Sequence, residues 1–248
     1  RPPIAPEMRL RIGLWLAALA AALGPVAASA QSYQCKVPRS VAVPGIAREG
    51  PTRTMPVTGY VLSLSWSPEF CRTRRDSARH ARQCSGRAGS FGLIVHGLWP
   101  QGAGRGGRSW PQWCAARRAR PSGAQLARQM CVQPSAQLAM RQWAKHGSCF
   151  VDTPDRYFRI TRILHRSLDW PDLDRLSRKE GLTAGDIRMA WMQANPYWRR
   201  EMINVKLNER GWLEEIRLCY GRDWMPAACK RSDRGAPDTE PAKIWRGL

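Results

Sequence analysis

Eight cysteines constrain the fold of this chain most strongly, because all of them come after a segment typical of export signals. That segment has a basic region at Arg9 and Arg11, an apolar stretch over residues 12–23 and a small-residue pattern over residues 28–30. An even number of cysteines in an exported chain indicates disulfides formed in an oxidising compartment, although eight cysteines leave 105 pairings open. No two of them have the CxxC spacing of zinc sites. They lie at positions 35, 71, 84, 114, 131, 149, 219 and 229.

The export segment also sets the expected boundaries of the chain. We expect Met8 to be the true start and the mature protein to begin near Gln31, since the apolar stretch is too short for a membrane span. The length of residues 31–248 suits one domain. The expected divisions are a signal peptide over 1–30, an irregular lead-in over 31–57, a folded domain over 58–229 and a polar, loosely ordered tail over 230–248.

The charge balance points to polyanionic partners. The formal net charge is +21, which concentrates polyanions at the surface and speeds their capture. The alternative is that the arginine content reflects a compositional bias of the genome. The arginines are spread along the chain, so the sequence identifies no single binding patch.

Hydrophobic patterning predicts an α+β fold with an antiparallel β-sheet core, several packed helices and stabilising disulfides. The segments do not alternate as regular strand–helix pairs, which argues against a parallel sheet. Predicted strands cover residues 60–66, 91–95, 202–207 and 212–219. Predicted helices cover residues 122–131, 134–146, 155–168 and 183–193.

Two of the four histidines lie in distinctive sequence frames. His96 belongs to Ile94-Val95-His96-Gly97-Leu98-Trp99-Pro100, and we expect it at the end of strand 91–95, where a side chain enters a site. His146 belongs to Trp143-Ala144-Lys145-His146-Gly147-Ser148-Cys149. Two imidazoles beside a lysine can cleave a phosphodiester without a metal, because one takes a proton, the other gives one and the cation stabilises the added negative charge.

Helical spacing groups the polar residues around His146. Arg141 and Lys145 are four residues apart, as are Gln142 and His146. At ~100° per residue, all four side chains fall within an arc of about 140° on a helix. A lone histidine near a helix end is more often a surface residue or a cap, so the interpretation of His146 depends on His96.

Together the two frames resemble the two active-site motifs of the ribonuclease T2 family. The likeness includes Tyr60-Val61-Leu62-Ser63-Leu64-Ser65-Trp66-Ser67-Pro68, which resembles the first core strand of that family, and Glu214-Glu215-Ile216-Arg217-Leu218-Cys219, which resembles a late strand. It covers roughly residues 60–229. The chain is thereby identified as a bacterial exported member, with residues 58–229 as the catalytic domain.

The resemblance implies a metal-independent endoribonuclease that acts on single-stranded RNA and needs no cofactor. The ribose 2′-hydroxyl would attack the adjacent phosphorus and give a 2′,3′-cyclic phosphate. His146 would take the proton of the 2′-hydroxyl and His96 would protonate the leaving 5′-oxygen, while Lys145 would neutralise the phosphorane. A metal-dependent nuclease is disfavoured, because the sequence has no cluster of carboxylates and histidines at metal-ligand spacing.

The chain departs from the family pattern at two positions, where Arg141 and Gln142 stand in place of His-Glu. Arg141 can still bind a phosphate, and Gln142 can donate a hydrogen bond to a phosphoryl oxygen but carries no charge. We expect activity to persist, lowered by ~10–100-fold. The alternative function is a catalytically weakened, cationic RNA-binding or cytotoxic protein on the same scaffold.

The resemblance also suggests base-binding residues and disulfide pairs. Trp99 and Trp110 would stack on the base 5′ to the cut. Gln101 would read that base, or is simply a loop residue. The pairs that the resemblance favours are Cys114–Cys149 and Cys219–Cys229, with Cys71–Cys84 closing a loop and Cys35–Cys131 left as the fourth pair. We expect a periplasmic or secreted monomer with no membrane attachment after signal cleavage.

Overall fold

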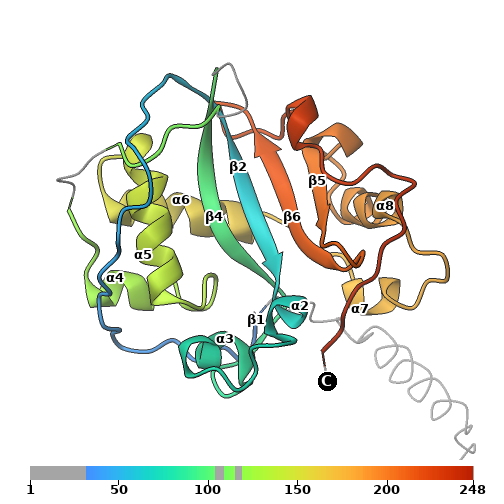
Figure 1. Ribbon diagram of the computed structural model, residues 1–248, viewed down its shortest axis with the longest axis horizontal. Coiled ribbons are helices and arrows are strands. Elements are labelled where there is room, and N and C mark those ends of the chain that lie inside the picture. The colour runs from blue at the N-terminus through green and yellow to red at the C-terminus, as the bar shows by residue number, and fades with distance from the viewer. Residues whose placement is uncertain (1–31, 104–108, 115–118, 248) are drawn as a thin grey trace, which may run out of the picture.

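A four-stranded antiparallel sheet forms the centre of the molecule. The computed structural model describes residues 32–103, 109–114 and 119–247, so the expected signal peptide lies outside the described residues. The strand order is β4-β2-β6-β5, and a small second sheet pairs β1 with β3 (Figure 1). The antiparallel pairing confirms the predicted α+β class. The strands are β1 (Ser32–Tyr33), β2 (Val57–Trp66), β3 (Ser90–Phe91), β4 (Leu93–Gly102), β5 (Ile203–Leu207) and β6 (Leu213–Tyr220).

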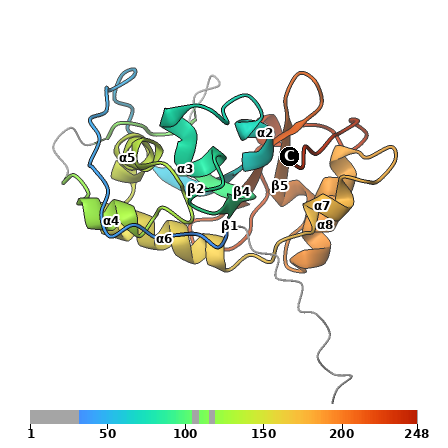
Figure 2. The ribbon, with the colours of Figure 1, turned by 90° about the horizontal axis from the view of Figure 1, so that it is seen from below.

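Helices lie on both sides of this sheet. Figure 2 shows α6 and α8 on one side and α2 and α3 on the other. The α-helices are α2 (Ser67–Cys71), α3 (Ala81–Cys84), α4 (Gly123–Ala127), α5 (Ala136–Lys145), α6 (Pro154–Arg166), α7 (Leu173–Leu176) and α8 (Ala184–Ala194). Single 3-10 turns form η2 (Ala78–His80), η3 (Gly147–Cys149), η4 (Arg200–Met202) and η5 (Arg231–Asp233).

The alternating sequence of β2 gives the sheet one apolar and one polar face. Leu62 and Leu64 are fully buried and pack with Ile216 and Leu218 of β6, in one core with apolar side chains of α6 and α8. Successive side chains of a strand point to opposite faces, so Ser63 and Ser65 lie on the other face. Their register partners on β6 are Arg217 and Glu215. The sheet therefore presents charged side chains on the face opposite the core.

Side-chain caps fix the starts of the main helices close to the predicted positions. Ser135 caps α5 by accepting the N–H of Leu138, and Thr153 does the same for α6 with Arg156. Thr183 caps α8 in a reciprocal pair with Asp186. Each cap satisfies a backbone donor that would lack a partner in the first turn. The segment predicted as helix 122–131 is shorter, because α4 ends at Ala127 and turns come after it.

The strand that carries His96 is longer than predicted. We placed its end at Val95, but β4 continues through His96 to Gly102. Pro100 does not stop it, because β4 is an edge strand of the sheet and a missing backbone N–H costs little there. His96 is consequently a residue within a strand.

The C-terminal segment differs from the expected loose tail. From Lys230 to Gly247 it runs along the protein surface and pairs with β5 and β6: Ala236 N donates to Val205 O at 2.9 Å, and Leu213 N donates to Lys243 O at 2.8 Å. Ala242 and Ile244 are buried. In an extended segment, side chains two residues apart point to the same side, so Ala242 and Ile244 can both pack against the protein even though the segment is mostly polar.

Four disulfides hold the segments outside the sheet. They join Cys35 to Cys131, Cys71 to Cys84, Cys114 to Cys149 and Cys219 to Cys229. The last two are the pairs that the family resemblance favoured, and the first two are the remaining pair and the loop-closing pair of the sequence analysis. The first anchors the lead-in, where β1 is succeeded by irregular structure up to Val57. Within the described ranges, no helix is long and apolar enough to cross a membrane.

Candidate active site

A β-bulge in β4 projects His96 onto the polar face of the sheet. Ser63 pairs with Gly97 and Leu64 pairs with Val95, so His96 has no register partner on β2. A bulge of this kind bends the strand and redirects the side chain of the extra residue. The side chain of Gln133 fixes the backbone there, because its Nε2 donates to His96 O at 2.8 Å.

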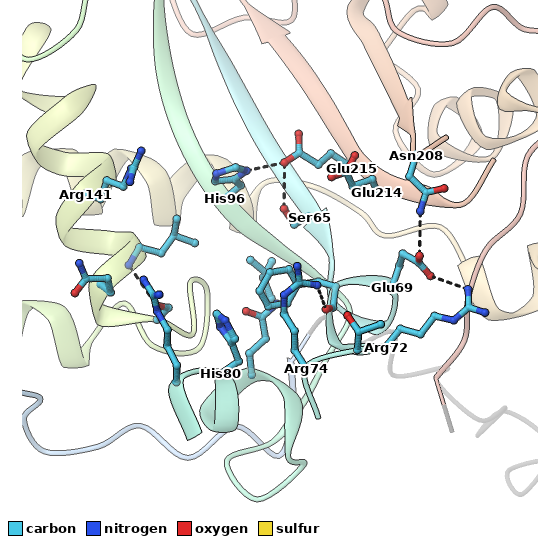
Figure 3. A pocket seen from close by; sticks show the side chains of 18 of the residues that line it. Ser65, Glu69, Arg72, Arg74, His80, His96, Arg141, Asn208, Glu214 and Glu215 are labelled. Atoms are coloured by element: carbon cyan, nitrogen blue, oxygen red, sulfur yellow. Dashed lines mark hydrogen bonds and ion pairs between the residues drawn. The ribbon is translucent and has the colours of Figure 1, made fainter. Parts of the chain in front are cut away.

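Glu215 on β6 holds the imidazole of His96. The Nδ1 atom of His96 lies 2.6 Å from Oε1 of this buried carboxylate (Figure 3). Arg217 donates to Oε2 from Nε at 2.9 Å and from Nη2 at 2.7 Å, and Ser65 Oγ lies 3.3 Å from Oε1. Burial alone would raise the pKa of Glu215, but the hydrogen bond to His96 and the charge of Arg217 lower it to about 2. A charged carboxylate places a proton on Nδ1 and leaves Nε2 facing outward.

His146 occupies the opposite electrical environment at the end of α5. It is the C-cap residue of that helix, and its backbone N–H donates to Gln142 O at 3.0 Å. The side chain is buried, and its Nδ1 has no hydrogen-bond partner among the described residues. Burial and, after it, the positive charges of Lys145 and His96 lower the pKa of His146 to about 3. The imidazole is therefore neutral at physiological pH and able to accept a proton.

The ring of Trp99 lies close to both histidines. The centroid of its ring system is 5.2 Å from that of His96 and 5.8 Å from that of His146. Its Nε1 donates to Oε1 of the buried Gln142 at 2.7 Å, which ties β4 to α5. A Cβ on Gly97 would collide with both atoms of that hydrogen bond, so this approach of strand and helix requires glycine after His96.

The two cations of α5 differ in their partners. Both terminal nitrogens of the Arg141 guanidinium contact the carboxylate of Glu49, a residue of the lead-in. The hydrogen bond to Arg141 lowers the pKa of Glu49, so this carboxylate is charged at neutral pH. Burial and the nearby charge of Arg141 lower the pKa of Lys145.

One cavity of about 320 Å³ brings the predicted site residues together. Its lining includes His96, Trp99, Gln101, Trp110, Arg141, Gln142, Lys145 and His146. Trp110 lines it while its ring also faces the guanidinium of Arg53 at 4.9 Å. Gln101 belongs to β4 rather than to a loop. The cavity is thus lined by a neutral imidazole, a second imidazole held by a carboxylate, and two cations. The two imidazoles can transfer protons to and from a bound anionic group, and the cations can stabilise its negative charge.

The sequence interpretation missed three charged residues of this site. Glu215 is buried and forms an ion pair with the half-buried Arg217 two residues along the same strand, and opposite charges at this spacing in a predicted strand were a usable signal. Glu49 lies in an irregular segment, 92 residues from Arg141, and no periodicity marks it. Across the described residues, no group of three or more His, Cys, Asp or Glu side chains could hold a metal ion.

Comparison with known proteins identifies one family model and bacterial relatives that are named as ribonucleases. Residues 57–188 match the model of the Ribonuclease T2 family. A protein named probable ribonuclease from Haemophilus influenzae is 33% identical over 189 residues, which span 73% of this chain and 64% of that protein. Ribonuclease I of Escherichia coli is 32% identical over 208 residues, which span 68% of this chain and 76% of that protein.

Solved structures share the fold at low sequence identity. Trichomaglin, described as an S-like ribonuclease, superposes with a TM-score of 0.58 at 19% identity, covering 75% of this chain and 98% of that one. The SF11-RNase of Nicotiana alata gives 0.56 at 20% identity, covering 77% and 100%. RNase NT in complex with 5′-AMP gives 0.54 at 16% identity, covering 76% and 99%.

Proposed function

The chain belongs to the ribonuclease T2 family, and we propose that it is a metal-independent endoribonuclease that cleaves single-stranded RNA by attack of the ribose 2′-hydroxyl. The observation that carries this proposal is the contrast between two imidazoles on one cavity. His96 lies against a carboxylate, whereas His146 is buried among cations. Environments that differ in this way separate a proton donor from a proton acceptor.

His146 starts the reaction as the base. Its Nδ1 is fully buried, so Nε2 is the nitrogen available to the cavity. It takes the proton of the 2′-hydroxyl as the 2′-oxygen forms a bond to phosphorus. DNA lacks this hydroxyl, so RNA selectivity is a consequence of the chemistry itself.

His96 completes the reaction as the acid. With a proton on Nδ1 held by Glu215, its Nε2–H is directed outward and protonates the 5′-oxygen as the P–O5′ bond breaks. The products are a 2′,3′-cyclic phosphate and a free 5′-hydroxyl. Hydrolysis of the cyclic ester then uses the same two groups in reversed roles.

Charge on the phosphorane is stabilised by the cations of α5. Lys145 and Arg141 line the cavity beside both imidazoles, and a pentavalent phosphorus carries more negative charge than the ground state. Trp99 and Trp110 supply aromatic surfaces for the base 5′ to the cut, and Gln101 supplies an amide at the same wall.

We further propose that the protein is exported and acts as a monomer in the periplasm or outside the cell. Four disulfides and the cleavage pattern at Ala30 support export. All groups of the site come from one chain, so the reaction requires no second copy.

The test is incubation of the purified mature chain with RNA in the presence of a chelator. We expect 2′,3′-cyclic phosphate ends, detected by mass spectrometry of short products. Activity that disappears on chelation would refute the metal-independent mechanism. RNA binding without cleavage would identify the catalytically weakened RNA-binding protein instead.

A further inference from the structure

A second cavity of about 710 Å³ opens on the far side of His96. It shares His96, Arg141 and Gln142 with the smaller cavity. Of the other residues described for the active site, only Glu215 and its neighbour Ser65 line it. One wall is the polar face of the sheet, at Ser65 and Glu215. The opposite wall is the disulfide hairpin, which we define as residues 67–84 and which contains α2, η2 and α3 (Figure 3).

Arginines dominate this second cavity. The disulfide hairpin contributes Arg72, Arg74 and Arg79, and the turn between β5 and β6 contributes Arg210. The guanidinium of Arg79 has no hydrogen bond or ion pair within the described part of the chain, and that of Arg74 bonds only the carbonyl of Phe70, at 2.8 Å. The charges of both arginines, after burial, lower the pKa of the nearby His80.

The carboxylates of the second cavity are already neutralised. Glu215 is held by His96 and Arg217. Glu69 lies 3.6 Å from Arg72 and accepts from Asn208 at 3.0 Å. Glu214 pairs with Lys206 at 3.0 Å. The positive charges of Arg74 and Arg79 consequently remain available for an anion from outside.

We propose that the disulfide hairpin binds RNA on the 3′ side of the cleaved bond, with Arg74 and Arg79 contacting backbone phosphates beyond the first nucleotide. This inference rests on the proposed function and extends it. The leaving 5′-oxygen must lie at His96, while the groups that hold the attacking ribose line only the smaller cavity. The strand that continues from the leaving oxygen therefore enters the larger cavity.

The disulfide hairpin is a rigid element. The disulfide between Cys71 and Cys84 closes it, and Gln83 Nε2 donates to Ser67 Oγ at 3.0 Å across its base. Cations on a rigid element lose less conformational entropy when they bind a ligand than cations on a mobile loop. The ring of Phe70, over which the Arg74 guanidinium lies at 4.5 Å, adds an aromatic surface to the same wall.

The experiment uses oligonucleotides that can be cut at one position only. A single ribonucleotide, in versions with each of the four bases, is placed in a 2′-O-methylated strand, which lacks the nucleophile elsewhere. The strand extends by several nucleotides either on the 3′ side or on the 5′ side of the ribonucleotide. We expect the 3′ extension to raise kcat/KM more than the 5′ extension.

The variant is Arg74→Ala/Arg79→Ala, and its control is Arg166→Ala, an exposed arginine of α6 on the other side of the sheet (Figure 2). The double variant should reduce the gain from the 3′ extension about tenfold at low salt, the effect of losing two exposed ion pairs. The slope of log KM against log salt should fall by about 0.7 for each lost phosphate contact. The control should keep both the gain and the slope.

The outcomes separate this inference from the proposed function. If the single-site substrate is cleaved but the 3′ extension gives no gain, or if the double variant keeps the gain, the hairpin does not bind RNA. If no substrate is cleaved, the proposed function fails, and binding of the fully 2′-O-methylated strand still decides the inference by fluorescence anisotropy. Equal binding by wild type and double variant would refute it.

Discussion

Arg141 of α5 and Glu49 of the lead-in form a two-armed ion pair at the rim of the active site. The carboxylate occupies the same two guanidinium nitrogens that a phosphate would use in bidentate binding. An RNA phosphate that binds Arg141 must therefore displace Glu49 or share the arginine with it. We therefore expect the irregular lead-in to affect the affinity of the site for RNA.

Glu49→Gln should lower KM for RNA by about two- to fivefold at low salt, because it removes an internal competitor for Arg141. The effect should fade at high salt, since the pair is solvent-exposed. The control is Glu180→Gln, which neutralises an exposed carboxylate in the turn before α8. A raised KM in Glu49→Gln would show instead that Glu49 positions Arg141 for the phosphate.

Glu215→Gln should lower kcat by about tenfold to a hundredfold, because the amide no longer fixes the tautomer or orientation of His96. The pH–rate profile on a dinucleotide, recorded for both enzymes, measures this loss. Ser65→Ala removes only a 3.3 Å contact to the same carboxylate and is the matched control. A folded Glu215→Gln enzyme with the wild-type rate and profile would exclude this positioning role.

Replacing either histidine should abolish most of the activity. His96→Phe and His146→Phe should each lower kcat by at least ~100-fold, and the double variant should be little worse, because acid and base act as a unit. Single-turnover rates on a dinucleotide provide the measurement. Losses that multiply in the double variant would mean that the two histidines act in separate steps.

Sequence reasoning identified the residues of the candidate site that lie in local motifs, and missed those that depend on strand register. His96, Lys145 and His146 lie in motifs, and one cavity brings them together. Glu215 reaches His96 only because β2 sets the register between β4 and β6, which a single sequence does not reveal. The bulge at His96 is likewise a property of the pairing, not of the strand itself.

Gln142→Glu tests whether the missing carboxylate limits the rate. Gln142 is buried, and its Oε1 accepts from Trp99, a contact that a glutamate oxygen can retain. A negative charge beside His146 should raise the pKa of that base from about 3. The base works unprotonated, so the acid limb of kcat, which falls as pH drops through this pKa, should move to higher pH. Gln101→Glu, on the same cavity but on β4, is the comparison variant, and equal shifts would show that the effect is not specific to position 142.

Removal of one disulfide should mainly lower the stability of the protein, and removal of another should mainly lower its kcat. Cys35→Ala/Cys131→Ala opens a loop of 96 residues and should cost about 5 kcal/mol of unfolding free energy, whereas Cys114→Ala/Cys149→Ala opens one of 35 and should cost about 4 kcal/mol.

The loss of kcat should show the opposite order and be larger for Cys114→Ala/Cys149→Ala. Cys114–Cys149 ties the loop after β4 to η3, directly after His146, and Trp113 N reinforces the link by donating to Lys145 O at 2.8 Å. A shift of about 1 Å between the imidazoles can cost ~100-fold, so kcat of the folded fraction should fall mainly in the second variant. Denaturant titrations and kcat on a dinucleotide measure the two quantities, and equal kinetic damage in both variants would show that the Cys114–Cys149 bridge does not set the geometry of the site.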